Sequence, residues 1–182
     1  MIILQQNEKI YLVKRKHEII LKLLIFPFLL LFIVFLFLML YFFFSEISWP
    51  KLFIEKFPEI SKFKLNFIIS FIFSLSLPVL WTLIFFIITK YYLTYWVVTN
   101  QRIIEVKLVG FFNVQYSSIE LDKIQDITIR IKGLLPFLLR FGDLRIQTAS
   151  EKGEFVFDQV GDPEIVKQVI YEAKIDYQKI KT

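Results

Sequence analysis

Two stretches of the sequence determine the architecture of this chain: LLIFPFLLLFIVFLFLMLYFFF at Leu23–Phe44 and LNFIISFIFSLSLPVLWTLIFFIIT at Leu65–Thr89. They run for 22 and 25 residues without a charged side chain. Because a helix needs about 20 apolar residues to cross the hydrocarbon core of a bilayer, each stretch predicts one transmembrane helix. The first run is too long for a signal peptide, and no small-residue cleavage site follows it. The sequence therefore predicts an integral membrane protein with two spans.

The remaining residues have the mixed composition of a soluble domain. We expect a basic N-terminal segment, a transmembrane helical hairpin and a soluble domain of about 90 residues, which is enough for one small fold. The expected bounds are 1–22 for the cytoplasmic N-terminal segment, 23–89 for the hairpin (spans 23–44 and 65–89, loop 45–64) and 90–182 for the cytoplasmic domain.

The distribution of Lys and Arg predicts the orientation of the spans. Eight of these residues lie before the first span or soon after the second, whereas the loop 45–64 carries four. Positive charge is retained on the cytoplasmic side of a membrane. We therefore expect a multi-pass protein of the inner (cell) membrane, with both termini cytoplasmic and the loop external.

The composition argues against several kinds of active site. The chain has no Cys, which excludes disulfides, thiolate metal sites and Cys nucleophiles. The single histidine, His17, has no partner for a metal site or a catalytic triad, and its neighbours Arg15 and Lys16 indicate a contact with lipid headgroups. The five glycines are isolated and form no phosphate-binding loop. We therefore expect no enzyme activity, no catalytic or metal-ligating residue and no cofactor.

The net charge of +5 is spread along the chain. In a membrane protein such charge reflects topology and anionic lipid, and no motif for nucleic-acid recognition is present. The expected partners are the lipid bilayer with its anionic headgroups, and either a membrane protein or a second copy of the chain. Nucleic acid is not expected to bind.

Small polar residues recur every four positions along the second span. On a helix this spacing drifts by about 40° per step, so the residues form a slowly turning stripe. The stripe is typical of helix packing, in which small polar residues hydrogen-bond across the contact. A polar pathway for a substrate is the alternative, although transport sites usually need a charged residue inside the span. The candidate packing residues are Asn66, Ser70, Ser74 and Thr82.

The soluble domain alternates apolar and polar residues, as short antiparallel strands do. The clearest strand is Ile127–Lys132, with one buried and one solvated face. Similar segments recur at about ten-residue spacing, and a hairpin turn is expected at Glu151–Gly153. Asp162 and Pro163 then favour the start of a C-terminal helix. The apolar stripe of this helix consists of Ile165, Val166, Val169, Ile170 and Ala173.

The stretch Tyr95–Ile104, YWVVTNQRII, resembles the opening motif of bacterial pleckstrin-homology-like (PH-like) membrane proteins, a family formerly classed as a domain of unknown function. The resemblance continues at Gly110–Phe112, Ile119–Ile127, Arg140–Gly142 and Gly161–Pro163, and the two spans are similar to those of the family's single-domain members. It implies a membrane α plus soluble β protein, in which a transmembrane hairpin precedes a PH-like antiparallel β-barrel or sandwich capped by a C-terminal α-helix. The resemblance implies no reaction.

The segment Leu134–Leu139 departs from the family pattern, because a hydrophobic run containing Pro136 replaces a more ordinary connection. Consecutive apolar residues between strands are costly if they remain in water. The segment is therefore either core packing beneath the barrel, or a surface that rests on the membrane or on a partner subunit while basic residues meet lipid phosphates. The candidate lipid or partner contacts are Arg130, Lys132, Phe137, Leu138 and Arg140.

These features predict a non-catalytic scaffold or adaptor. It presents a PH-like domain at the inner face of the membrane, where it binds protein or lipid. The alternative is an accessory subunit of a membrane transport or export assembly that oligomerises through the second span. Assembly through the polar stripe would favour this alternative.

Overall fold

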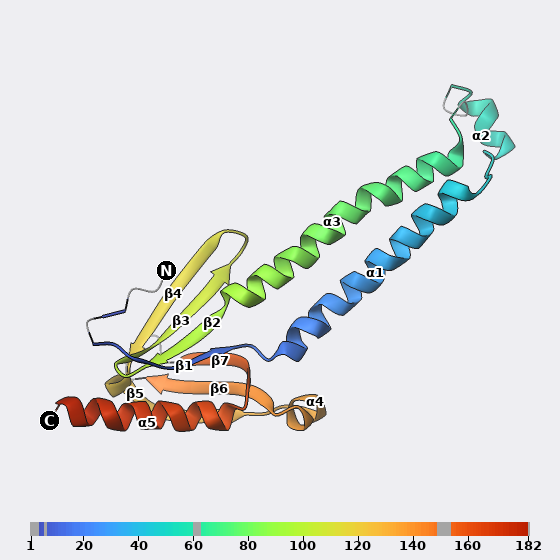
Figure 1. Cartoon of the computed structure of the whole chain (residues 1–182). Coiled ribbons are helices and arrows are strands. Elements are labelled where there is room, and N and C mark those ends of the chain that lie inside the picture. The colour runs from blue at the N-terminus through green and yellow to red at the C-terminus, as the bar shows by residue number, and fades with distance from the viewer. Residues whose placement is uncertain (1–3, 6, 60–62, 149–153, 182) are drawn as a thin grey trace. The chain divides into compact units, whose positions relative to one another are not determined.

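The structure of the chain is a computed structural model that describes residues 4–5, 7–59, 63–148 and 154–181 (Figure 1). It divides into two compact units. Residues 22–88 form one, here called the helical unit, and residues 1–21 together with 89–182 form the other, the sheet unit. Along the sequence, the helical unit is thus an insertion into the sheet unit.

Two long helices, α1 (Glu18–Phe44) and α3 (Leu65–Leu93), make up most of the helical unit. Both are long and apolar enough to cross a membrane. A short helix, α2 (Lys51–Lys56), lies in the loop between them and starts directly after Pro50, whose φ of −59° suits a helix start. Each long helix extends beyond its expected span at the end that joins the sheet unit, by five residues to Glu18 and by four to Leu93.

The sheet unit contains two antiparallel sheets. The first sheet has the strand order β1 (Ile10–Arg15), β2 (Tyr95–Thr99), β3 (Arg102–Val109) and β4 (Asn113–Glu120). The second sheet has the order β5 (Ile124–Arg130), β6 (Phe141–Thr148) and β7 (Glu154–Gly161). The connecting and following helices are the 3-10 turn η2 (Leu121–Lys123), α4 (Leu134–Leu138) and α5 (Pro163–Lys181).

Strand β1 lies in the segment 1–22, which is expected from the sequence only as a basic N-terminal segment. It pairs antiparallel with β2, and the register places Arg15 opposite Tyr95. The helical unit therefore connects two neighbouring strands of one sheet. The run of basic residues Lys14–Lys16 hides the alternation of this strand, and its partner lies far along the sequence.

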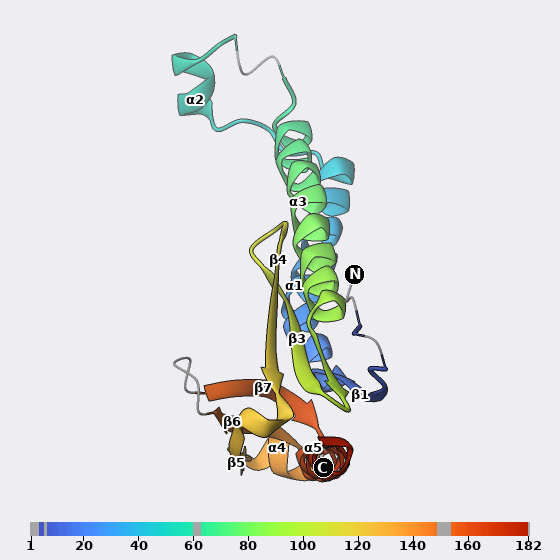
Figure 2. The same cartoon turned by 90° about the vertical axis from the view of Figure 1, so that its left-hand side faces the viewer.

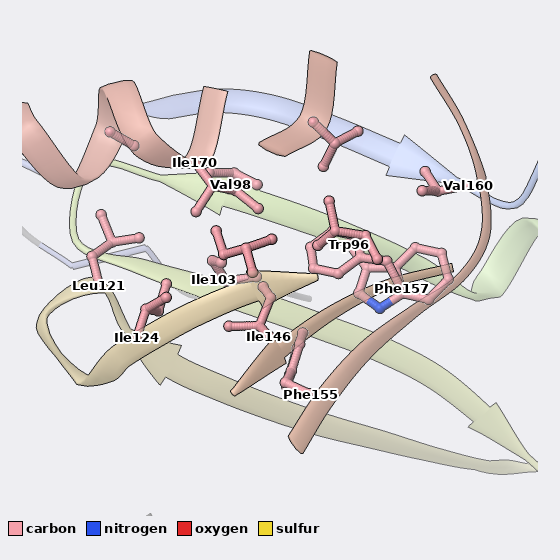
Figure 3. Close-up of a cluster of buried hydrophobic side chains, with 14 residues drawn as sticks. Trp96, Val98, Ile103, Leu121, Ile124, Ile146, Phe155, Phe157, Val160 and Ile170 are labelled. Carbon is pink, nitrogen blue, oxygen red and sulfur yellow. The ribbon is translucent and has the colours of Figure 1, made fainter. Parts of the chain in front are cut away.

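The main hydrophobic core lies between the two sheets and is covered by α5 (Figure 3). Trp96 of the first sheet stacks on Phe157 of the second, with ring centroids 5.1 Å apart. Helix α5 contributes Val166, Ile170 and Ala173, which are fully buried, as the predicted apolar stripe requires. Ile165, which was assigned to the same stripe, is instead half exposed.

The two sheets do not close into a barrel, so a sandwich is the one of the two expected arrangements that describes the sheet unit. The consecutive strands β4 and β5 belong to different sheets, because η2 turns the chain from one sheet into the other. Figure 2 shows the strands of the second sheet crossing those of the first. Among the described residues, an isolated antiparallel bridge between Lys16 and Val160 connects the two sheets beside β1. The hairpin turn expected at Glu151–Gly153 lies outside the described residues.

Shortening a buried side chain of α5 should destabilise the sheet unit. We expect Ile170→Ala to lower the free energy of unfolding by about 2–4 kcal/mol, because it removes methylene groups from a closed core and leaves a cavity. The matched control is Ile175→Ala on the same helix, where the side chain is 51% exposed and the loss should stay below about 1 kcal/mol. Denaturant titration of the full chain in detergent, followed by Trp fluorescence, measures both. Equal losses for the two variants would contradict the core assignment of α5.

Candidate membrane-contact site

The two long helices join the sheet unit at the same end of the first sheet. Arg15 and Tyr95 are paired residues of β1 and β2, and α1 begins three residues after Arg15, at Glu18. On the other side α3 ends at Leu93, two residues before Tyr95. The Tyr91 hydroxyl donates a hydrogen bond of 2.9 Å to the backbone carbonyl of Lys16 and so links the two connections. We call this edge of the sheet unit the junction end.

His17 attaches the second sheet to the junction end. Its backbone N–H donates to the carbonyl of Gln159 at 2.8 Å, and its ring stacks on Phe141 with centroids 5.2 Å apart. Gly161 must remain small beside it, because a Cβ atom there would lie 3.0 Å from the His17 Cδ2 atom. His17 therefore has a packing role in the structure, and its contacts with protein, which sequence reasoning missed, come from strands β6 and β7.

Helix α4 lies close to this attachment in the sequence, and none of its residues is buried. It precedes Phe141, the residue that stacks on His17, by only a few positions. Leu134 is 82% exposed, Phe137 70% and Leu138 74%. Of the two interpretations of this segment, core packing is therefore not what the structure shows. The exposed apolar surface corresponds to the alternative interpretation, in which it rests on a membrane or a partner.

Basic residues flank this apolar surface. Arg130 ends β5, Lys132 follows it, and Arg140 lies between α4 and β6; all three are exposed. Together with Phe137 and Leu138 they form the set that the sequence predicts, here called the α4 patch. Beside the patch lies a depression of about 670 Å³ lined by Ile131, Phe137, Leu138, Arg140 and Asp162–Ile165 at the start of α5. The structure thus places all five residues on one short surface segment, and their contact with lipid or a partner stays a prediction.

The polar stripe of the second span follows the helix contact only in part. Asn66 and Ser70 are buried in the helical unit, and the Ser70 hydroxyl donates to the backbone carbonyl of Met39 on α1 at 3.0 Å. Ser74 and Thr82 are exposed, and the Thr82 hydroxyl donates to the carbonyl of Pro78 in its own helix.

Only part of the polar stripe lies in the contact with α1 because the stripe and the contact line have different periods. The buried residues Leu80 and Ile84 repeat the positions of Asn66 and Ser70 after 14 residues, as in a contact line with a 3.5-residue period. A stripe with a spacing of four turns away from such a line by about 40–60° per step.

The most recognisable motif of the chain, Thr99–Arg102, holds a buried ion pair. Arg102 donates from Nε and Nη2 to the two carboxylate oxygens of Glu8, at 2.9 Å and 3.0 Å, and the Glu8 side chain is fully buried. The Thr99 hydroxyl lies 2.9 Å from the same carboxylate and accepts hydrogen bonds from the backbone N–H groups of Gln101 and Arg102. The side chain of Asn100 completes the cluster by accepting from the Lys9 N–H at 2.8 Å.

This cluster fastens the segment before β1 to the turn between β2 and β3. Burial would raise the pKa of Glu8, but the hydrogen bonds from Arg102, the Gln5 N–H and Thr99 outweigh it, and the pKa is lowered from 4.5. The hydrogen bond to Glu8 raises the pKa of Arg102 in turn. Because every polar group named here contacts another protein group, the motif has a role in stabilising the fold.

A second carboxyl has its pKa shifted in the opposite direction. Burial raises the pKa of Glu105 above its ordinary value, although the Trp96 indole N–H donates to it at 3.1 Å. Glu105 lines a cleft of about 700 Å³ between β3–β4 and β7, together with Lys107, Ser117 and Asp158. Within the described residues no group of three or more His, Asp or Glu side chains could hold a metal ion.

Comparison with known proteins points to one family. The family model described as bacterial PH domain matches residues 20–174. A crystal structure of a DUF1696 family protein with a pleckstrin-homology domain from Shewanella loihica PV-4 is similar at 19% identity and a TM-score of 0.37; the match covers 44% of this chain and 70% of that chain. No curated protein matches the chain.

Removing the charge of Glu8 should destabilise the sheet unit in a pH-dependent way. We expect Glu8→Gln to lower the free energy of unfolding at pH 7 by about 2 kcal/mol, because it weakens a buried charge-assisted pair. The folded-state pKa of Glu8 lies below 4.5, so its ionised form stabilises the fold above pH 4.5 and this contribution is lost as the pH falls through the folded-state value. Denaturation curves of the wild type and the variant should therefore converge below pH 4.5.

The control for this variant is Glu154→Gln, which alters a partly exposed pair with Arg145. Its effect should stay within about 1 kcal/mol at all pH values. A loss for Glu8→Gln that is independent of pH would contradict the role of the ionised carboxylate.

Proposed function

Because the chain belongs to the bacterial PH domain family, we propose that it is a membrane-anchored, non-catalytic binding protein. In this proposal α1 and α3 cross the inner membrane of a bacterium and present the PH-like sheet unit at its cytoplasmic face. There the α4 patch binds the lipid surface. The observation that carries the proposal is the exposed apolar helix α4 with its three flanking cations, next to the point where α1 begins.

The composition of the helical unit supports the membrane anchor. Both helices have large apolar side chains on their outer surfaces; Phe37 is 70% exposed and Trp81 is 61% exposed. Such surfaces are costly in water but match the hydrocarbon of a bilayer. Eight Lys and Arg residues flank the spans on the side of the sheet unit, whereas the loop 45–64 carries four. This difference favours a cytoplasmic sheet unit.

The short connections keep the sheet unit near the bilayer. Only Lys16 and His17 separate β1 from α1, and only Thr94 separates α3 from β2. One or two residues span at most about 7 Å when extended. The sheet unit therefore cannot move far from the interface that the helices enter, and its surfaces at the junction end are available to lipid.

The chemistry of the α4 patch fits an anionic lipid surface. Leu134, Phe137 and Leu138 can enter the boundary between headgroups and acyl chains, as the apolar side of an interfacial helix does. Arg130, Lys132 and Arg140 can meet lipid phosphates, and each such cation near an anionic surface contributes about 1 kcal/mol. A protein surface of complementary shape is the competing partner.

Charges placed on α4 should abolish lipid binding without unfolding the sheet unit. A soluble form can be made by replacing residues 22–88 with a short linker, because β1 and β2 are paired neighbours. We expect this form to float with phosphatidylglycerol vesicles, and Phe137→Asp with Leu138→Asp to weaken the binding by at least about tenfold. The control Ile175→Asp alters an exposed apolar residue outside the patch and should bind like the parent.

Two results would contradict this role of α4. If the parent form is folded but does not bind anionic vesicles, the lipid surface is excluded as its partner. Loss of the native circular dichroism in the Phe137→Asp and Leu138→Asp variant shows that the segment is core.

The orientation is testable because the chain has no natural Cys. We expect Ser48→Cys, in the exposed loop before α2, to react with a membrane-impermeant maleimide in intact spheroplasts. Asp122→Cys, on the exposed turn η2, should react only after the membrane is permeabilised. The reverse pattern would place the sheet unit on the outer side.

A further inference from the structure

We propose that the turn between β3 and β4 is a second lipid-contact element, which inserts Phe111 and Phe112 into the interfacial region of the leaflet beside the sheet unit. The inference rests on the proposed function, since it requires α1 and α3 to cross the membrane. It adds a separate contact with lipid on the first sheet, whereas the α4 patch belongs to the second.

The β3–β4 turn exposes more apolar surface than a hairpin turn in water should. Phe112 is 93% exposed, Phe111 65% and Val109 44%. The two rings lie beside each other, with centroids 6.4 Å apart, at the tip of the hairpin. Gly110 adopts a φ of +70°, which an L side chain rarely takes, and so allows the tight reversal that brings both aromatic residues to the tip.

The register of the first sheet shows where this tip points. Tyr95, the first residue of β2, lies opposite Val106 of β3. Within the described residues, Lys107–Val109 continue β3 with partners in β4 and none in β2. Three further residues of strand extend about 10 Å. The tip therefore projects beyond the junction end, as the long arrows of β3 and β4 past the start of β2 show (Figure 1).

In the proposed topology the membrane interface lies near that same end. Arg15 and Tyr95 are the strand residues nearest to the two long helices, so a bilayer that contains these helices begins close to this level. The Arg15 guanidinium lies over the rings of Tyr92 and Tyr95, 5.8 Å and 5.9 Å from their centroids, which is the kind of aromatic and basic belt found at membrane interfaces.

The composition of the tip fits a lipid surface. A hairpin tip that lies about 10 Å beyond the junction end can reach the headgroup and acyl boundary, in which the apolar faces of interfacial segments are buried. Lys107, exposed on the hairpin below the aromatic pair, lies where phosphate groups would be. The partner is therefore the acyl and headgroup boundary of the same leaflet that the α4 patch faces.

Nitroxide labels on single Cys residues test this depth in the full chain. Phe112→Cys is the test position, Asp122→Cys at the opposite end of β4 is the aqueous control, and Phe37→Cys on α1 is the lipid control. The protein is reconstituted in vesicles of phosphatidylcholine and phosphatidylglycerol. Collision rates are then measured with oxygen, which concentrates in lipid, and with a water-soluble nickel chelate. We expect the oxygen-to-nickel ratio at position 112 to exceed that at position 122 by about threefold or more.

The outcomes separate this inference from the proposed function. A label at position 112 that behaves like position 122, while position 37 is in lipid, overturns the inference and leaves the membrane anchor intact. A label at position 112 that is shielded from both reagents shows a protein contact and also overturns it. A label at position 37 that lies in water contradicts the membrane anchor itself, and therefore also the inference that rests on it. Because Phe112 is 93% exposed, its replacement leaves the core of the sheet unit unchanged.

Discussion

The pairing of β1 with β2 is the interaction on which the rest of the structure depends. It joins Arg15 to Tyr95 across 80 positions of sequence, most of which belong to the helical unit of residues 22–88. Closing so long a loop costs conformational entropy. The buried pair of Glu8 and Arg102 offsets part of this cost, since it fastens the segment before β1 to the turn after β2. Without this pairing the first sheet would lose its edge strand, and the chain would no longer enter and leave the helical unit from neighbouring strands.

The most recognisable residues of the chain and its candidate site lie in different places. Thr99 and Arg102 belong to the motif that carries the family resemblance, and their side chains are occupied by Glu8 and by local backbone groups. The α4 patch instead lies on and beside Leu134–Leu139, the segment in which the sequence analysis finds a departure from the family pattern. In this protein the shared motif stabilises the fold, whereas the proposed binding surface is a local variation on it. This division is common where one fold supports many functions.

Sequence patterns predict the elements whose signals are local. The two long helices follow from uncharged composition, and α5 follows from its apolar stripe and from Pro163. Strand β1 could not be predicted in this way, because its partner is remote and Lys14 continues into a basic run that hides the alternation. The polar stripe predicts the contact between the long helices only in part, since Ser70 donates a hydrogen bond to α1 whereas Thr82 donates within its own helix. The residues of the α4 patch were identifiable, but their exposure depends on how α4 packs, which requires the tertiary structure.

The insertion of the helical unit between paired strands has a consequence for biogenesis. During synthesis β1 emerges long before β2, and in the proposed topology it must wait on the cytoplasmic side until both helices have entered the bilayer. Only an even number of crossings returns the chain to that side. A molecule in which one helix failed to insert would hold Ile10–Arg15 and Tyr95–Thr99 on opposite sides of the membrane, and the first sheet would lack its edge. In the proposed topology, folding of the sheet unit would thus depend on correct membrane insertion, and unpaired strands would mark a defective molecule for quality-control proteases.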